Sequence, residues 1–370
     1  MEPKQPKARV LAYYLPQFHP IPENDEWWGK GFTEWTNVGK AKPLFPGHYQ
    51  PRVPADLGYY DLRVPETRKA QADMAREYGV EGFVYWHYWF GNGKRLLERP
   101  FNEVLTSGEP DFPFALAWAN ETWSGFYHGL RDEKQILIEQ KYPGEEDYIA
   151  HFYEVLPAFK DKRYITCEGK PIFIIYKPDQ IPNTKEFIDL WQKLAIENGL
   201  QGIHFIAHEQ EVEDSSRLDI IYNRDKRFGF DSINIVNKFI NSTTNLPLHY
   251  RLARKFLHKY KKFRIIPNLM PYIPELYTTK YDIKEDVFPS VCPGWDHTPR
   301  TGIDGRVVLE STPEKFFKAC ELAVQNVAHK NSERKFIFIK SWNEWAEGNY
   351  MEPDLKYGRK YLEALQKSLF

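Results

Sequence analysis

Two carboxylates near the carboxyl end of the chain have the residue types and spacing that acid–base chemistry on a sugar requires. Glu344 and Glu347 come shortly after the apolar run 336–339. They stand among an amide and two large rings: Trp342, Asn343 and Trp345. One carboxyl group can transfer a proton while the other manages charge at the sugar, and flat rings bind the C–H faces of sugars. The structural alternative is a helix start, with Asn343 as its cap and Glu347 in its first turn.

A third carboxylate has a similar setting. Glu121 follows Asn120 in the stretch Trp-Ala-Asn-Glu-Thr-Trp (118–123), so a second Asn-Glu pair lies beside tryptophan. We therefore take Glu344, Glu347 and Glu121 as the candidate catalytic residues.

The tryptophans cluster in the same kind of position. Aromatic residues make up 16% of the chain, and of its 11 tryptophans only Trp191 falls on a predicted helix. The others follow or end predicted strands, which indicates a ring-lined binding site. Alternatively, large residues are there only to cover the end of a barrel. The candidate substrate-binding residues are Trp35, Trp86, His87, Tyr88, Trp118, Asn120, Trp123, Trp295, Trp342, Asn343 and Trp345.

Short apolar runs that alternate with helix-like segments must position these residues. The predicted strands cover 10–15, 82–86, 114–118, 172–176, 203–207, 233–236, 287–291 and 336–339. The predicted helices cover 65–78, 184–198, 312–328 and 354–369. This alternation predicts an α/β fold, a single (β/α)8 TIM barrel over residues 1–370 with long loops at its C-terminal face and an insertion around 241–279. The alternative is a doubly wound sheet, but no Gly-x-Gly-x-x-Gly follows the first strand.

Composition narrows the functional classes. The 50 basic and 51 acidic residues balance, so nothing suggests nucleic acid as a partner. The three cysteines are far apart and form no disulfide framework or metal spacing. Residues 1–10 lack an apolar signal segment, so we expect a cytoplasmic protein, or a periplasmic or secreted one if a signal peptide was removed. We expect no cofactor and no metal, and the alternative is a metal site at Asp296-His297. The oligomeric state is not predicted.

One segment of the chain is strongly basic. No acidic residue occurs between Leu246 and Pro274, and basic residues alternate with apolar ones at near-helical spacing over 246–264. Such a segment predicts contact with an anionic membrane surface or a lipid-linked or acidic glycan. The alternative is a peripheral helix that packs its apolar side on the barrel.

Five motifs together resemble the WbsX-type, glycoside hydrolase family 99-like proteins. They are Tyr-Tyr-Leu-Pro-Gln-Phe-His (13–19), Trp-Trp-Gly-Lys-Gly-Phe-Thr-Glu-Trp (27–35), Tyr-Trp-His-Tyr-Trp (85–89), Trp-Ala-Asn-Glu-Thr-Trp (118–123) and Trp-Asn-Glu-Trp-Ala-Glu-Gly (342–348). Members of this group are often found with surface-polysaccharide genes and have been labelled glycosyltransferases. The related family 99 enzymes are retaining endo-α-mannosidases on a (β/α)8 barrel, with their catalytic pair in a similar Asn-Glu-x-x-Glu-Gly motif. Ala346 stands where those enzymes usually have histidine.

The resemblance implies roles for the two acids. Glu344 matches the base that takes the proton of the sugar's 2-hydroxyl, which leads to a 1,2-anhydro sugar. Glu347 matches the acid that protonates the leaving oxygen and then activates water. Apolar walls from the neighbouring tryptophans are expected to raise the pKa of the acid. The rival chemistry is double displacement between Glu121 and Glu344.

Three function classes remain open from the sequence. A retaining glycoside hydrolase that acts on a surface or complex polysaccharide or oligosaccharide accounts for both the acids and the rings. A glycosyltransferase of O-antigen or capsule biosynthesis is the alternative, although no Asp-x-Asp motif or phosphate-binding glycine loop is present. A non-catalytic carbohydrate-binding protein would keep the rings but has no use for paired acids.

Overall fold

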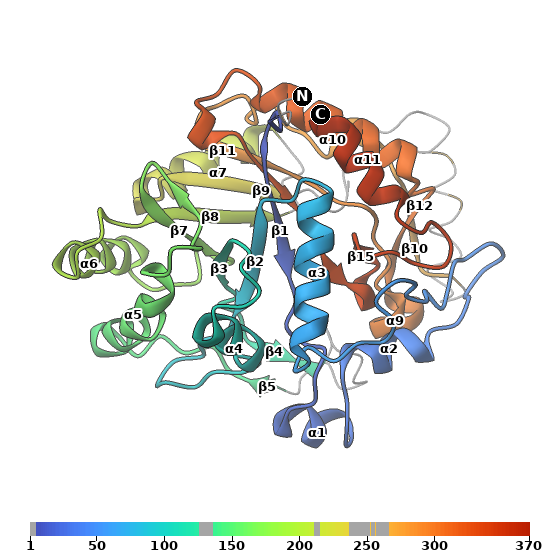
Figure 1. The fold of residues 1–370 in the computed structure, drawn as a ribbon, viewed down its shortest axis with the longest axis horizontal. Coiled ribbons are helices and arrows are strands. Elements are labelled where there is room, and N and C mark those ends of the chain that lie inside the picture. Colours follow the sequence, from blue (N-terminus) through green and yellow to red (C-terminus); the bar gives the residue numbers. More distant parts are fainter. Residues whose placement is uncertain (1–4, 126–135, 211–214, 237–251, 253–255, 257–265) are drawn as a thin grey trace.

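Eight parallel strands close into a barrel. The structure is a computed structural model that describes residues 5–125, 136–210, 215–236, 252, 256 and 266–370. The barrel strands, shown in Figure 1, are β1 (Arg9–Tyr14), β2 (Gly82–His87), β3 (Phe114–Trp118), β7 (Lys170–Ile175), β8 (His204–Gln210), β9 (Ser232–Val236), β11 (Val287–Val291) and β13 (Phe336–Ile339). Each strand pairs with the next around the ring, and β3–β7 and β1–β13 pairings complete it. The predicted (β/α)8 barrel is thus confirmed, and the doubly wound alternative is wrong because this sheet has no open edges at β3 and β7.

Helices follow most barrel strands and cover the outside of the sheet (Figure 1). They are α3 (Pro65–Glu77), α4 (Arg99–Ser107), α5 (Glu145–Phe159), α6 (Thr184–Glu197), α7 (Ser215–Phe228), α10 (Pro313–Val327) and α11 (Lys360–Leu369). Three predicted helices match α3, α6 and α10 closely. The fourth was predicted to start at Asp354, but α11 starts at Lys360. The reason is local, because the Asp354 carboxylate accepts the backbone N–H groups of Lys356 and Tyr357 and so stabilises a turn.

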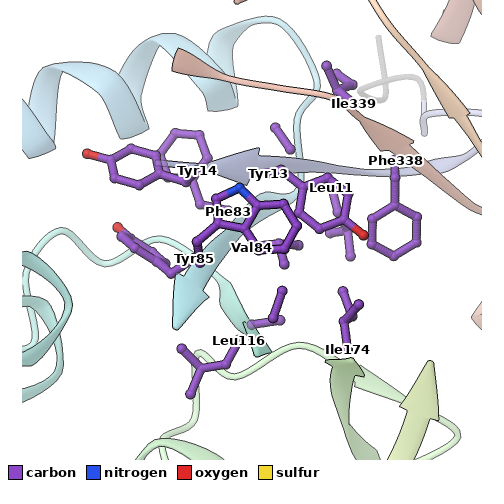
Figure 2. Close-up of a cluster of buried hydrophobic side chains, with 14 of the residues drawn as sticks. Leu11, Tyr13, Tyr14, Phe83, Val84, Tyr85, Leu116, Ile174, Phe338 and Ile339 are labelled. Atoms are coloured by element: carbon purple, nitrogen blue, oxygen red, sulfur yellow. The ribbon is translucent and has the colours of Figure 1, made fainter. Parts of the chain in front are cut away.

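The barrel strands are buried on both faces, as parallel strands in such folds are. Tyr13 of β1 stacks on Trp86 of β2 and hydrogen-bonds Asn234 of β9, so its side chain points into the barrel. The next residue, Tyr14, instead donates a hydrogen bond to Gln71 of α3 and lies outside the barrel. Figure 2 shows Tyr13 near Phe338 and Tyr14 near Tyr85, in agreement with these ring contacts. Side chains therefore alternate between the barrel interior and the helix layer.

Short elements at the C-terminal ends of the strands surround the candidate site. After β1 come α1 (Pro22–Trp28) and α2 (Glu34–Lys40), and β4 (Trp123–Ser124) and β5 (Ile136–Ile138) follow β3. α9 (Thr298–Thr301) and η3 (Gly302–Asp304) follow β11. β14 (Asn343–Glu344), η5 (Trp345–Glu347) and β15 (Asn349–Tyr350) follow β13. At the opposite end, β6 (Thr166–Cys167) pairs with β7, and η4 (Ser332–Arg334) precedes β13.

Part of the predicted insertion is described. β10 (Asn268–Pro271) pairs in parallel with β12 (Arg306–Leu309). The short helix η2 (Pro274–Leu276) follows β10 in the chain. The basic segment 246–264 lies outside the described residues except for Leu252 and Phe256, which are both exposed. Within the described part of the chain, no helix has the length and apolarity needed to cross a membrane.

Candidate active site

Glu344 lies directly beyond β13 and is held by two donors. Its side chain is buried, with the residue only 4% exposed. Trp86 Nε1, from inside the barrel, donates a hydrogen bond of 2.9 Å to Glu344 Oε1. The Lys340 ammonium group forms a buried ion pair with Oε2. An indole donor on one oxygen and an ammonium group on the other fix the orientation of this side chain.

The turn that carries Glu344 is fixed by its neighbours. Asn343 Oδ1 accepts the backbone N–H of Leu15 at 2.7 Å, and Asn343 Nδ2 donates to the Leu15 carbonyl at 3.0 Å. Ser341 Oγ accepts the backbone N–H of Glu344 and donates to the carbonyl of Asn349. The side chain of Asn343 thus replaces a strand pairing between the ends of β1 and β13. This leaves the next side chain, Glu344, to face Trp86 inside the barrel.

Glu347 occupies the other end of the same turn. Its side chain is 15% exposed, and the guanidinium of Arg300 in α9 contacts its Oε1 atom. His297 Nε2 lies 3.9 Å from the same oxygen, and Asn349 Nδ2 donates to Oε2 at 3.4 Å. Glu347 therefore lies among polar and cationic groups, and the raising of its pKa by tryptophan walls stays a prediction.

Arg300 joins Glu347 to a carboxylate that sequence reasoning missed. Glu34, the first residue of α2, has no exposed surface, and its Oε2 lies 3.1 Å from Arg300 NH2. Burial lowers the pKa of Arg300, but the charges of Glu34, Glu347 and Glu344 outweigh this and raise it. Two carboxylates from distant parts of the chain, Glu34 and Glu347, therefore contact one guanidinium, and the charge of Glu344 also acts on it.

Glu121 reaches the same region from β3. Its side chain is 41% exposed and lies 3.9 Å from Lys177 Nζ. Burial raises the pKa of Tyr176, and the charges of Glu121, Glu347 and Glu344 raise it further, so all three acids act on one tyrosine. The structure thus brings the three predicted catalytic residues to one end of the barrel.

Tyr88 and the interior rings lie beside these acids. Burial raises the pKa of Tyr88, and the charges of Glu344, Glu121 and Glu34 add to this while Arg300 opposes it. Trp86 stacks on Tyr13, and the Trp86 and Tyr176 rings meet edge to face with centroids 5.4 Å apart. Of the predicted binding residues, Trp86 contacts Glu344 directly, and Tyr88 lies close enough to the acids for their charges to raise its pKa.

Several predicted binding residues face away from the site. Trp118 donates to the Trp89 carbonyl and packs against α5 and α6, and His87 shares a 2.8 Å hydrogen bond with His151 of α5. Both side chains point toward the helix layer, because they occupy outward-facing positions on their strands. The expectation that Trp118 and His87 line the same site as the acids is therefore wrong.

Other predicted binding side chains are used for packing or backbone pairing. Trp342 is fully buried beside Phe83, and Trp345 stacks on Tyr350 with centroids 3.8 Å apart. The side-chain amide of Asn343 forms hydrogen bonds with both backbone groups of Leu15. Asn120 makes the equivalent pair of hydrogen bonds to the N–H and carbonyl of Lys177.

The remaining three predicted rings lie in the loops around the barrel end. Trp35 donates to the Tyr60 carbonyl, and Trp123 packs edge to face on Tyr88. Trp295 is buried, with its ring 6.2 Å from that of His297. Trp123 and Trp295 thus contact residues that themselves adjoin the acids.

The carboxylate of Asp296, the alternative metal ligand, forms hydrogen bonds with three side chains. Its Oδ2 contacts His48 Nε2 at 2.8 Å and accepts a bond from Gln50 Nε2 at 2.7 Å, and its Oδ1 accepts from Thr298. Across the described ranges, no group of three or more His, Cys, Asp or Glu side chains is arranged to hold a metal ion.

Two of the missed residues had a signal in the sequence. Glu34 lies within the Trp-Trp-Gly-Lys-Gly-Phe-Thr-Glu-Trp motif, and Lys340 lies four residues before Glu344. Arg300 has no comparable pattern, because its position depends on how the loop after β11 folds across the barrel end.

Comparison with known proteins agrees with this architecture. Residues 10–365 match the family described as "Glycosyltransferase WbsX". Two strains of Xanthomonas campestris pv. campestris have an "Uncharacterized protein WxcX" that is 36% identical over 371 residues, covering 99% of this chain. The chain spans about half the length (50%) of these relatives.

Solved structures share the fold at low sequence identity. A "glycoside hydrolase-like protein" has a TM-score of 0.61 at 14% identity, covering 100% of this chain and 95% of its own. The GH99 endo-α-mannosidase from Bacteroides thetaiotaomicron has a TM-score of 0.53 at 16% identity, covering 97% of this chain and 95% of its own. The expected resemblance is confirmed by the match over nearly the whole chain, and this protein belongs to the WbsX family.

Proposed function

We propose that this protein is a carbohydrate-active enzyme, and specifically a retaining glycoside hydrolase that acts on a complex or surface glycan. The observation that carries the proposal is the group of Glu344, Glu347 and Glu121 at one end of the barrel. Each of these acids lies beside a cation, and aromatic side chains lie in the same region. The similar fold of the GH99 endo-α-mannosidases supports the hydrolase class.

In the proposed reaction, Glu344 acts as the base. Its carboxylate is held by Trp86 and Lys340, and it takes the proton of the sugar's 2-hydroxyl. The resulting oxygen forms a bond to the anomeric carbon as the bond to the leaving oxygen breaks. Glu347 gives its proton to the leaving oxygen, so the product of this step is a 1,2-anhydro sugar. Water then opens the small ring, losing a proton to Glu347 while Glu344 returns one to the 2-oxygen.

Loss of either acid should abolish catalysis without unfolding the protein. We expect Glu344→Gln and Glu347→Gln each to lower turnover by about a hundred- to ten-thousand-fold, the usual contribution of a general acid or base. The assay incubates the purified chain with defined oligosaccharides and follows the product and its anomeric configuration by NMR. The matched control is Glu26→Gln, which removes an exposed carboxylate from α1.

The outcome also separates the two hydrolytic mechanisms. Near-normal turnover by both Glu344→Gln and Glu347→Gln would remove their assignment. Inactive Glu121→Gln and Glu344→Gln together with an active Glu347→Gln would instead favour double displacement between Glu121 and Glu344.

The second candidate is glycosyl transfer, which the family description favours. A transferase joins a sugar from an activated donor to the oligosaccharide, so its product is longer than the acceptor. Adding sugar nucleotides to the same assay distinguishes the two activities, because only transfer depends on the donor.

A further inference from the structure

The Glu34 side chain forms the far side of the group around Arg300. It lies at the start of α2, more than three hundred residues before Glu347, and has no exposed surface. Arg300 Nε and NH2 lie 3.3 Å and 3.1 Å from Glu34 Oε2, while Arg300 NH1 contacts Glu347 Oε1. One guanidinium therefore has a carboxylate on each of two edges, and both bonds are charge-assisted.

In this buried group, the carboxylates outnumber the cations that contact them. The carboxylates of Glu34, Glu344 and Glu347 contact only two cations, Lys340 and Arg300. The exposed Lys40 also acts on Glu34, and His297 adds a positive charge beside Glu347 when it is protonated. An unneutralised buried charge is costly, so the group is poised to hold a proton. Among the described residues, Glu34 Oε1 has no hydrogen-bond partner.

The surrounding groups strengthen this conclusion. Burial raises the pKa of Glu34, Arg300 lowers it, and the charges of Glu347 and Glu344 raise it, with a net upward shift. The other groups that face the pair are Tyr88 beyond β2, His297 beside Glu347, and Lys40 at the end of α2. Of these three, Lys40 is a cation. Burial lowers its pKa, and the charge of Glu34 only partly offsets this.

We propose that Glu34 is a positioning residue that sets, through Arg300, the pH range in which Glu347 holds a proton. The proposal rests on the proposed role of Glu347 as the acid. A guanidinium alone beside Glu347 stabilises the carboxylate and so opposes proton donation. A second carboxylate on the same guanidinium offsets that charge, which lets Glu347 keep its proton to higher pH.

The test measures the titration of Glu347 without a substrate. The full chain is labelled with glutamate carrying ¹³C at Cδ, and the Glu347 resonance is assigned by its loss in Glu347→Gln. We expect Glu34→Gln to move the Glu347 midpoint to lower pH by about one unit, as removal of one nearby negative charge predicts. Glu34→Asp, which keeps the charge, should leave the midpoint closer to the wild-type value. Glu26→Gln, which removes an exposed carboxylate from α1, should not change it.

An unchanged Glu347 midpoint in folded Glu34→Gln would overturn the proposal and leave Glu34 a purely structural contact. If Glu34→Gln does not fold, the wild-type curve decides. Because the two carboxylates share Arg300, the Glu347 resonance should show a second inflection where Glu34 titrates. A single inflection would overturn the coupling. Failure of the proposed function would appear only in the oligosaccharide assay, so the two failures are distinguishable.

Discussion

In each of the two Asn-Glu pairs of the site, the asparagine and the glutamate have different roles. Asn343 pairs with both backbone groups of Leu15, and Asn120 pairs with both backbone groups of Lys177. Each asparagine therefore extends the pairing between neighbouring strands beyond the end of the sheet. The following residue, Glu344 or Glu121, is left to face the barrel end. This explains why Asn343 and Asn120, which the sequence predicts to bind sugar, instead form hydrogen bonds with backbone groups.

Glu352 is a buried carboxyl group that anchors the same turn. Its oxygens accept hydrogen bonds from Tyr60, Gln71 and Trp345, at 2.8, 2.6 and 2.6 Å. Burial raises its pKa to about 7, although these donors oppose the shift. Because the unfolded group titrates near pH 4.3, the native state binds this proton more tightly than the unfolded chain does. Its contribution to stability is therefore fully present at low pH and is lost as pH rises toward about 7.

This difference predicts a pH-dependent effect of Glu352→Gln. The variant cannot ionise, so the wild type should lose about 2 kcal/mol of unfolding free energy relative to it between pH 5 and pH 8. Urea denaturation of both proteins at the two pH values measures the change. A stability difference that is equal at pH 5 and pH 8 would contradict the raised pKa.

At the scale of elements, the barrel strands could be predicted from the sequence, but which of their side chains point into the barrel could not. All eight predicted runs coincide with barrel strands, because each is a short apolar segment bounded by polar or turn residues. The same burial on both faces removes the alternation that would reveal which side chains point inward. Trp86 points inward, whereas His87 and Trp118 point outward, and no difference in residue type distinguishes them.

The loops gave weaker signals than the strands. Glu344 and Glu347 could be found because they lie close together in sequence after a strand. Glu34 and Arg300 could not be recognised as a pair, because only the folded chain brings α2 against α9. Long-range placement of this kind depends on loop conformation, which has no simple periodicity.

Gly348 ends the turn that carries both acids, and its substitution tests that turn. Its φ is 66°, and a Cβ atom there would lie 2.7 Å from the backbone nitrogen of Asp296. Gly348→Ala therefore combines strain in φ with a backbone clash, and we expect it to lower the unfolding free energy by about 2 kcal/mol or more. Activity should fall as well, since Glu347 immediately precedes the displaced backbone and Glu344 lies in the same turn.

Gly358→Ala is the matched control for this prediction. Gly358 also has a positive φ, 54°, but a Cβ atom there would meet nothing within 4 Å. It should show only the smaller cost of the backbone conformation, about 1 kcal/mol. Equal losses in the two variants, measured by urea denaturation, would show that the close approach to Asp296 adds nothing.

At the scale of the whole molecule, most of the site is assembled from the two ends of the chain, and Glu121 and Tyr176 come from between them. Glu34 and Trp86 come from the first quarter, and Arg300, Lys340, Glu344 and Glu347 from the last. Closure of the barrel through the β1–β13 pairing is what brings these segments together. The charge needed for the chemistry is therefore local, while the chain as a whole carries a formal net charge of only −1.

That overall balance makes the basic segment 246–264 a testable source of surface binding. A protein of net charge −1 has no general attraction to an anionic surface, so any binding must come from a local concentration of basic residues. From the sequence we expect the protein to sediment with anionic liposomes at low salt and to be released at high salt, because added salt screens such contacts. A variant with the basic residues of 246–264 changed to Gln should not sediment, whereas a variant with Lys185 and Lys193 of α6 changed to Gln should behave like the wild type. Absence of sedimentation at low salt would leave this segment with the structural role alone.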